Sequence, residues 1–421
     1  MMILFGGILL LLALLGAPLF AVIAASAMWG YYQADIDLSA VAIEFFSVGT
    51  MPFLLAIPLF TFAGFVLSES GAPRWLVRIT RALLGWMPGG LAIVSLAACA
   101  FFTAFTGASG VTIIALGAIL YPALTQAGYP ERFNLGLVTS AGSLGLLFAP
   151  SLPLILYGVV AQQSIDELFR AGVLPGLLML IMLSGWSLWV NRHQRQPLSD
   201  FSWREVAGAV RESAWEIPLP IVVLGGIYSG LIGVSEAAAV TALYVVFVEV
   251  FMLREIPLRQ LPRIMRESML LVGGILVILG VSLASTNIMI DAGVPQKLLA
   301  VVEQFVSGPL TFLLLLLVFL LILGAILDIF SALVLVVPLI LPVAAQYDIH
   351  PIHLGIIFLA AMQLGYLTPP VGLNLFIASY RFEEPIVRVY LATLPFLLIL
   401  LISVIIITYV PALSLWLLPG L

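Results

Sequence analysis

The chain has 421 residues, of which 63% are hydrophobic and 9% are charged, and its formal net charge is -5. This composition excludes an ordinary soluble domain and predicts a polytopic membrane protein, because apolar runs long enough to cross a bilayer core of about 30 Å recur along the chain. The single Cys99 excludes an internal disulfide. No Gly-rich phosphate-binding loop with its Lys is present, which excludes ATP hydrolysis by this chain. Neither a cofactor nor a nucleic-acid partner is expected.

The N-terminal region predicts two membrane crossings. Met1 to Met28 is apolar without a basic leading segment. A cleaved signal with Ala24–Ala27 as its processing site is the alternative, but the run is too long and its flank is wrong. We therefore expect a retained first helix at about 3–29, followed by a helix at about 48–68.

The next part of the chain predicts a helical hairpin and a broken helix. Residues 91–124 are expected to enter and leave the membrane on one side, with the tip of the hairpin near Gly107–Gly110. A helix at about 133–160 is interrupted by Gly and Pro, which break helical hydrogen bonding or permit unusual backbone angles. With a returning helix, these elements complete a first structural unit at 1–190.

A polar stretch at 191–216 is the longest in the chain and predicts a cytoplasmic linker with one amphipathic helix. The second unit, 217–421, repeats the pattern of the first. Its hairpin is expected at about 309–345 and its broken helix at about 351–379. Four further crossings are expected at about 217–234, 236–253, 268–288 and 391–412.

The interruptions occur in the same order in both units. Four Pro and Gly positions are separated by 14, 9 and 5 residues in the first unit and by 13, 10 and 4 residues in the second. Paired interrupted segments of this kind are the best sequence indication of a transporter's binding site. The matched positions are Pro122, Gly136, Gly145 and Pro150 with Pro342, Gly355, Gly365 and Pro369.

The basic residues predict the orientation, because cytoplasmic loops carry an excess of Lys and Arg. Only Arg170 and Lys297 lie outside five short segments, and the acidic segment 31–44 has no base. Placing the five segments on one side gives the two units opposite orientations, which defines an inverted-topology repeat. The basic segments contain Arg74, Arg78 and Arg81; Arg132; Arg192, Arg195, Arg204 and Arg211; Arg254, Arg259, Arg263 and Arg266; and Arg381 and Arg388.

Hydroxyl groups and free carbonyls at the interruptions predict the site. Oxygen ligands suit sodium, and helix N-termini attract carboxylates. The alternative is that the small residues only allow close helix packing. As substrate-binding candidates we take Ser109, Gly110, Thr112, Ser143 and Asn374. As sodium-binding candidates we take Thr106, Gly107, Ser109, Ser140 and Gly142 in the first unit and Asp328, Ser331, Gly365, Thr368 and Gly372 in the second.

Two of these positions have specific arguments. Asp328 is ionisable at membrane depth, which favours a functional role, although a helix cap at the hairpin bend is the alternative. Thr368 lies at a Pro-Pro break that must leave carbonyls without partners. By contrast, His350 and His353 are expected to cap a helix at the outer surface rather than to bind a metal.

A competing class is an intramembrane serine protease, because Gly107–Gly110 fits the Gly-x-Ser-Gly string of rhomboid-type enzymes. A serine nucleophile needs a base within hydrogen-bond reach. The chain has three histidines, His193, His350 and His353, and none is expected at the midplane. The enzyme hypothesis is therefore disfavoured.

The chain resembles the large membrane subunit of tripartite ATP-independent periplasmic (TRAP) transporters over essentially its whole length. The resemblance rests on five groups of residues: Phe105 to Gly110 with Leu120-Tyr121-Pro122 and Gly128-Tyr129; Gly142-Ser143-Leu144-Gly145 to Pro150-Ser151; Gly226-Ile227-Tyr228-Ser229-Gly230 to Ser235-Glu236-Ala237-Ala238; Gly324 to Asp328 with Pro338 and Pro342; and Gly365 to Asn374.

This resemblance implies a sodium-driven importer of organic acids in a bacterial inner membrane. It also implies a small membrane subunit, a periplasmic binding protein that delivers the substrate, and an elevator movement of a domain that carries both hairpins. Many relatives have Ser-Gly-Ser-Ser at the first tip where this chain has Thr106-Gly-Ala-Ser-Gly110, so the ligands of the first sodium site stay open. A sodium/carboxylate symporter that needs no binding protein is the rival hypothesis.

Overall fold

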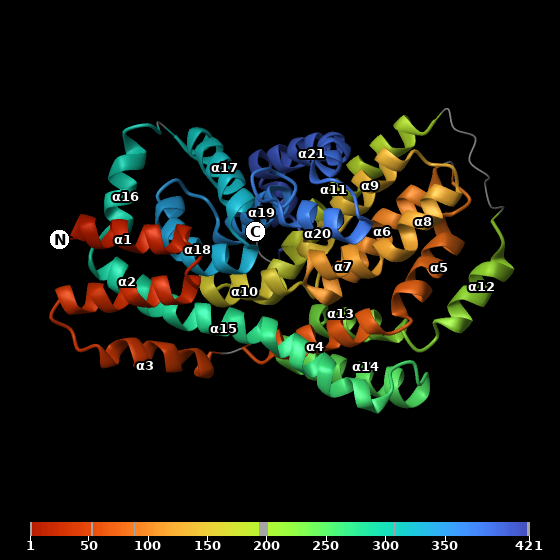
Figure 1. Ribbon diagram of the computed structural model, residues 1–421, viewed down its shortest axis with the longest axis horizontal. Helices are drawn as coiled ribbons and strands as arrows, with labels where there is room; N and C mark the ends of the chain where they lie inside the picture. The colour runs from red at the N-terminus through yellow and green to blue at the C-terminus, as the bar shows by residue number, and fades with distance from the viewer. Residues whose placement is uncertain (1, 52–53, 88, 193–200, 307, 419–421) are drawn as a thin grey trace.

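The computed structural model describes residues 2–51, 54–87, 89–192, 201–306 and 308–418 (Figure 1), and its regular elements are helices in all of these ranges. Five helices in this part of the chain are long and apolar enough to cross a membrane, or up to seven if each bent pair is one span. This confirms the prediction of an all-α polytopic membrane protein. The expected linker 191–216 lies only partly within the described ranges.

The N-terminal region differs from the prediction. Instead of one helix at 3–29, the chain forms α1 (Met2–Leu14) and α2 (Leu19–Gln33), which fold back on each other side by side (Figure 1). The expectation of a continuous helix was wrong because Gly16 adopts φ +90, a left-handed conformation that favours glycine, and Pro18 then precedes α2. A further helix, α3 (Ser39–Ser47), follows.

The first predicted hairpin is formed by α6, which descends to a tight turn, and by two helices that return. The first predicted broken helix follows directly, with a 3-10 turn in its gap. The returning pair is bent by 48° and the broken helix by 41°. The bounds are α6 Gly90–Thr106, α7 Ser109–Ala115, α8 Gly117–Gln126, α9 Glu131–Ala141, η2 Leu144–Leu147 and α10 Leu152–Ala161.

The second hairpin and broken helix have a similar construction. Their helices are α17 (Pro309–Ile326), α18 (Ile329–Ala345), α19 (Pro351–Gly365) and α20 (Leu373–Phe382). The gap between α19 and α20 contains Pro369 and Pro370, so no continuous helix crosses it. Two helical hairpins and two broken helices are thus present, which confirms the predicted fold class, whereas the division into repeats at 1–190 and 217–421 stays a prediction.

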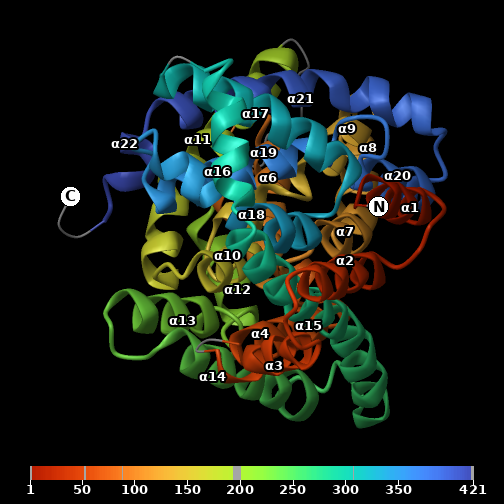
Figure 2. The same cartoon turned by 90° about the vertical axis from the view of Figure 1, so that its left-hand side faces the viewer.

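The remaining long helices surround these elements. The 31-residue α15 runs along one side of the molecule and packs against α2, α3, α4 and α18 (Figures 1 and 2). The bounds of the other helices are α4 Ala56–Glu69, α5 Ala72–Leu84, α11 Ile165–Val190, α12 Trp203–Glu212, α13 Pro218–Tyr228, α14 Val234–Val246, α15 Leu261–Asp291, α16 Val294–Glu303, α21 Ile386–Tyr409 and α22 Ala412–Leu415.

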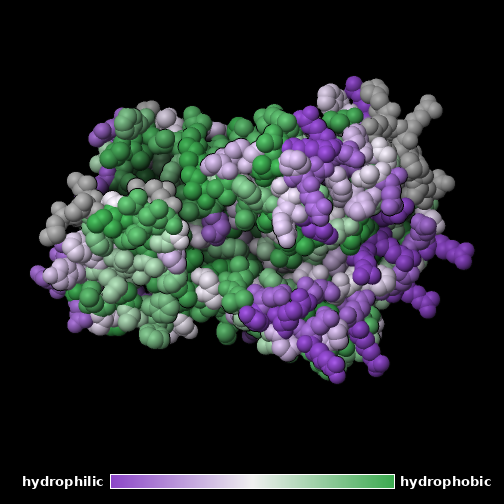
Figure 3. Space-filling model, viewed as in Figure 1, coloured by the Kyte–Doolittle hydropathy of each residue, from purple (hydrophilic) through white to green (hydrophobic). Residues whose placement is uncertain are grey.

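Hydrophilic residues gather at one end of the molecule, over α5, α12 and the end of α14, on the right in Figure 3. The described residues of the basic segments that were predicted to be cytoplasmic lie at this end, and we call it the Arg-rich end. Ion pairs join segments that are far apart in sequence: Arg78 with Glu212, Arg263 with Glu69 at 2.7 Å, and Arg388 with Glu131 at 2.9 Å.

Candidate substrate and sodium site

The tips of the two hairpins meet at a cavity of about 350 Å³, which we call the tip cavity. Both tips and the start of α20 line it, together with one residue each from α4, η2 and α15 and with Tyr366 at the end of α19. The residues that line it are Phe65, Gly107, Ala108, Ser109, Gly110, Val111, Leu146, Leu271, Asp328, Ile329, Phe330, Tyr366, Leu373 and Ile377. Residues that are more than 200 positions apart in the chain thus share one site.

The first tip is a tight turn set by Gly107. This residue ends α6 with φ +65, and a side chain there would also meet Leu152 at 2.5 Å, so both backbone angle and space require glycine. The chain leaves the turn at Ala108 in extended conformation, and α7 begins at Ser109. The predicted site residues Gly107, Ser109 and Gly110 therefore lie in the wall of the cavity.

A buried hydrogen bond joins the first tip to the second broken helix. The Ser109 hydroxyl donates to Asn374 Oδ1 at 2.7 Å, and Asn374 Nδ2 donates to the Thr139 carbonyl at 3.5 Å. Asn374 is fully buried and lies behind Ser109. The structure thus brings together two of the predicted substrate-binding residues and links both to the first broken helix.

A second polar contact lies behind the first tip. The Thr103 hydroxyl donates to the Gly142 carbonyl at 2.9 Å and lies 2.7 Å from the Thr112 hydroxyl. Thr112 and Ser143 are buried and do not line the tip cavity, although both were predicted to bind substrate. Ser143 is 3.5 Å from the Ser140 carbonyl, at the limit of a hydrogen bond.

Two hydroxyl oxygens in this region are buried without a hydrogen-bond partner: Thr106 Oγ1 at the end of α6 and Ser140 Oγ near the end of α9. A buried hydroxyl without any partner costs about 1–3 kcal/mol, so each of these groups is expected to bind water or a ligand. Both residues belong to the predicted sodium set, and their free lone pairs fit an oxygen-ligated cation.

The second tip is held by Asp328, which caps α18. Its carboxylate accepts from the backbone N–H groups of Phe330 and Ser331 at 3.0 Å each and from the Ser331 hydroxyl at 2.5 Å. The Tyr366 hydroxyl accepts the Ile329 N–H at 2.8 Å. The cap that was the alternative for Asp328 is therefore present, and the residue also faces the tip cavity.

The gap between α19 and α20 contains or adjoins the other sodium-binding candidates of the second unit, Gly365, Thr368 and Gly372. Thr368 donates its hydroxyl to the Gly365 carbonyl at 2.7 Å, and Gly372 precedes α20. Gly365 lies against Gly324 so closely that a Cβ on Gly365 would be 2.4 Å from the Gly324 carbonyl carbon. Close packing, the alternative for these small residues, is thus present at Gly365.

Asp328 is the one charged residue among the described residues that line the tip cavity. A carboxylate with no basic neighbour in a cavity of low polarity favours a cation there and opposes an isolated anion. Groups of three or more His, Cys, Asp or Glu that could hold a metal are absent from the described residues. The carboxylate, hydroxyl and backbone carbonyl oxygens at the two tips are ligands of the kind that hard cations take.

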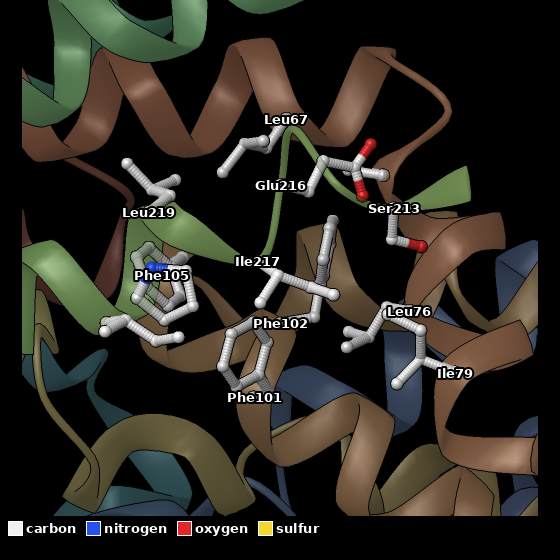
Figure 4. Close-up of a pocket in the computed structure, with 13 residues that line it drawn as sticks. Leu67, Leu76, Ile79, Phe101, Phe102, Phe105, Ser213, Glu216, Ile217 and Leu219 are labelled. Atoms are coloured by element: carbon white, nitrogen blue, oxygen red, sulfur yellow. The ribbon is translucent and has the colours of Figure 1, made fainter. Parts of the chain in front are cut away.

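A separate cavity of about 300 Å³ lies between α5, α6 and α13 (Figure 4). Leucine, isoleucine and phenylalanine side chains form most of its wall, with the Glu216 carboxylate at one edge. Burial, and then the neighbouring Glu249 and Glu255, raise the pKa of Glu216 to about 8. None of the predicted site residues lies in this cavity, so we do not place the substrate there.

The protease hypothesis finds no support in the geometry of Ser109, whose hydroxyl donates to an amide oxygen rather than to a base. His350 caps α19 by accepting the Ile352 N–H at 3.2 Å, as predicted. His353, which was expected at the surface, is instead buried between Ser414 and the Thr408 carbonyl. The position of His193 lies outside the described residues.

Sequence reasoning missed three residues that organise the site: Thr103, Thr139 and Tyr366. Thr103 lies three residues before Thr106, on the same helix face, and that spacing could have indicated it. Thr139 contributes only its backbone carbonyl, for which no sequence signal exists. Tyr366 belongs to the motif Gly365 to Asn374, but nothing in the sequence indicates that its hydroxyl accepts the Ile329 N–H.

Two helical hairpins and two broken helices around the tip cavity are the arrangement of an integral-membrane transport protein, and the curated relatives described below are named as permeases. The family described as "Tripartite ATP-independent periplasmic transporter, DctM component" matches residues 6–413. The chain belongs to this family, as the resemblance predicted.

Individual relatives agree with this assignment. The C4-dicarboxylate TRAP transporter large permease protein DctM of Pseudomonas aeruginosa is 36% identical over 90% of this chain and 89% of its own length. The isethionate TRAP transporter permease protein DctMQ of Oleidesulfovibrio alaskensis is 33% identical over 89% of this chain and 59% of its own length.

A solved structure supports the fold alone. The Alcanivorax borkumensis YdaH transporter, described as having an unusual topology, superposes with a TM-score of 0.58 at 14% identity, covering 90% of this chain and 89% of that one. At this level of identity the likeness shows how the helices are arranged and carries no information about substrate.

Proposed function

We propose that this chain is the transport subunit of a sodium-coupled importer of an organic acid. The substrate and sodium bind where the two hairpin tips meet the two broken helices, and a domain that carries both hairpins moves against the surrounding helices as an elevator. The chain acts in a bacterial inner membrane together with a small membrane subunit and a periplasmic binding protein.

The main support for sodium coupling is that the buried hydroxyls of Thr106 and Ser140 have no hydrogen-bond partner in the protein. Both lie beside interruptions where small residues and unwound backbone supply further oxygens. Hard cations are bound by such oxygens, and broken helices supply them in other secondary transporters. The Asp328 carboxylate in the tip cavity adds a negative potential that attracts the cation.

An organic acid is the substrate class that fits best once sodium is present. The cavity volume of about 350 Å³ accommodates a small molecule, and its walls are largely apolar with a few polar groups, as in other ligand sites. No Lys or Arg is among the described residues that line it. The negative charge of the substrate is then balanced by bound sodium and by the N-terminus of α20, which begins beside Asn374. The two relatives carry C4-dicarboxylates and isethionate, which are small anions.

The partners follow from the family rather than from the structure. TRAP permeases act with a small membrane subunit, and the longer isethionate relative bears the name DctMQ. The periplasmic binding protein would approach from the end opposite to the Arg-rich end. Membrane lipid surrounds the exposed apolar surface.

Thr106→Val is the sharpest test of sodium binding. The substitution keeps the shape of the side chain and removes a hydroxyl that has no protein partner, so it should not destabilise the protein in the absence of sodium. If the hydroxyl binds sodium, the sodium concentration for half-maximal uptake should rise about tenfold, which corresponds to about 1.4 kcal/mol. Uptake of a labelled organic acid into proteoliposomes measures this value.

Thr408→Val is the matched control, because Thr408 is equally buried but donates its hydroxyl within its own helix to the Val404 carbonyl. It should leave the sodium dependence unchanged. An unaltered sodium requirement in Thr106→Val, or uptake by the wild type that needs no sodium, would remove sodium from the proposal.

Uptake measured with and without a periplasmic binding protein separates the proposal from its rival. The proposed assembly needs the binding protein and the small membrane subunit for uptake. A sodium/carboxylate symporter would import its substrate with neither. Ser109→Ala and Thr368→Val should also weaken the sodium dependence without preventing insertion.

A further inference from the structure

Another cavity, of about 270 Å³ and with more polar groups in its wall than the tip cavity, lies between α15, α18 and the end of α10. We call it the distal cavity, because it lies farther from the Arg-rich end along α15 than the tip cavity. The residues that line it are Val160, Ala161, Gln162, Leu279, Ser282, Leu283, Thr286, Asn287, Ile290, Val334, Pro338, Leu341 and Pro342.

The distal cavity contains polar groups that lack partners inside the protein. Ser282 is buried, and its hydroxyl has no hydrogen-bond partner. Pro338 and Pro342 lie inside α18 and have no N–H, so the carbonyls of Val334 and Pro338 lose their normal helical donors. Unpaired groups of this kind call for water or a polar ligand.

One face of α15 lines both cavities. Leu271 lies in the wall of the tip cavity, and Ser282 and Thr286 lie in the wall of the distal cavity. Leu271 and Ser282 are 11 residues apart, which is about three full turns, so they project from the same side of the helix. The same 11 residues correspond to about 16 Å along the helix axis.

Helix α18 also takes part in both cavities and packs against α15 (Figures 1 and 2). Its first residues, Ile329 and Phe330, line the tip cavity, and Val334 and Pro338 line the distal cavity. A shift of α18 by about 16 Å along α15 would therefore bring Phe330 and the rest of the second tip level with Ser282.

In the present position, Leu271 of α15 forms one wall of the substrate site. We propose that Ser282, Thr286 and Asn287 of α15 form this wall instead, as a second wall, when the hairpins have moved away from the Arg-rich end and the tips lie beside these residues. The inference rests on the proposed function, and it assigns a substrate-binding role to α15 residues that do not contact the tip cavity in the present position. The wall is apolar at Leu271 and polar at Ser282, so the substrate is more hydrated in the second position. These α15 residues bind the polar groups of the organic acid or the water around it.

Cysteine cross-linking tests the second position directly. In a background with Cys99→Ala, the pair Leu271→Cys with Phe330→Cys reports the present position, and the pair Ser282→Cys with Phe330→Cys reports the second. Both pairs should cross-link with a short bifunctional thiol reagent in membranes. Formation of the first product without the second, under all sodium and substrate conditions, would overturn the proposal.

The hydroxyl of Ser282 can be tested by uptake. Ser282→Ala should keep the unfolding temperature of the wild type because the hydroxyl has no protein partner, but it should reduce uptake about two- to tenfold, the effect of one lost hydrogen bond. Ser268→Ala is the matched control on the same helix, since the Ser268 hydroxyl donates to the Met265 carbonyl. It should not change uptake. Unchanged uptake in Ser282→Ala would exclude a contact between this hydroxyl and the substrate.

These experiments can fail separately from the proposed function. Cross-linking needs neither sodium nor a known substrate, so a missing second product in a protein that performs sodium-driven uptake would contradict only the second wall. Conversely, uptake without sodium would contradict the coupling ion while the two cross-linked products remained.

Discussion

Gly365→Ala should destabilise the protein through the contact between α17 and α19. A Cβ at this position would lie 2.4 Å from the Gly324 carbonyl carbon and 2.5 Å from its Cα. Both neighbours are backbone atoms, so a flexible side chain cannot move aside, and the two helices must separate by about 1 Å to restore van der Waals contact. Overpacking of this kind costs about 1–3 kcal/mol.

The site should respond to the same substitution. Beside Gly365, the Val371 N–H donates to the Ala325 carbonyl at 3.2 Å and Tyr366 accepts the Ile329 N–H, so separation of the helices disturbs the second tip. We expect a lower unfolding temperature together with reduced sodium-dependent uptake. Intrinsic fluorescence during heating in detergent measures the first, because the chain contains 8 Trp residues.

Gly185→Ala is the matched control, since Gly185 lies in α11 and an added Cβ there would meet nothing within 4 Å. Alanine is a better helix former than glycine, so this variant should be as stable as the wild type or more stable by up to about 1 kcal/mol. If Gly365→Ala unfolded at the same temperature as Gly185→Ala, the close packing of the second hairpin on its broken helix would be refuted.

Three further predictions concern other contacts. The pKa of Glu216 is about 8 in the folded state, above its ordinary 4.5, so the folded state holds this proton more tightly than the unfolded state and stability falls as pH rises. The loss contributed by Glu216 between about pH 6 and pH 8 is about 2 kcal/mol. Glu216→Gln should abolish this loss, which thermal unfolding at several pH values measures. Ser109→Ala leaves the buried Asn374 amide without its donor, and unfolding should cost about 1–3 kcal/mol less, with a double-mutant cycle giving a coupling of about 1 kcal/mol. Gly64→Ala places a Cβ 2.7 Å from the Phe105 carbonyl oxygen and should reduce uptake, because it wedges α4 away from the first tip.

Each of these predictions has an outcome that contradicts it. Glu205→Gln, at an exposed position of α12, should leave the pH dependence of the wild type intact, and an equal effect in both Gln variants would exclude Glu216 as its origin. Additive effects of Ser109→Ala and Asn374→Ala would show that the two residues do not interact. Uptake by Gly64→Ala equal to that of the wild type would mean that this contact does not limit movement.

The hairpins and broken helices could be predicted because their signals are local. Glycine and proline interrupt apolar runs at Gly107, Pro150 and Pro369, and such residues act on the backbone wherever they occur. The same reasoning, applied to Gly16 and Pro18, would have divided the first helix. The prediction of one helix at 3–29 rested on a long apolar run without a basic leading segment, and it did not include the effect of these two residues on the backbone.

The contacts between the two halves could be predicted only in part. The repeat placed Ser109 and Asn374 in one region, but their hydrogen bond spans 265 positions and depends on how the helices pack. The partnerless hydroxyls of Thr106 and Ser140 are likewise properties of the folded chain. Hydrophobic pattern does not determine which of several buried hydroxyls finds a partner, since each can also bond within its own helix.

The distribution of contacts bears on movement. Within the set formed by the two hairpins and the two broken helices, hydrogen bonds and close glycine contacts join the parts, as at Ser109 with Asn374 and at Gly324 with Gly365. Across the boundary between α15 and α18, no hydrogen bond links the two helices in the part of the chain that the structure describes. Polar contacts resist sliding because their geometry is specific, whereas apolar side chains can exchange neighbours along a helix at little cost. This distribution supports the proposed motion of the hairpins as one body along α15, from Leu271 toward Ser282.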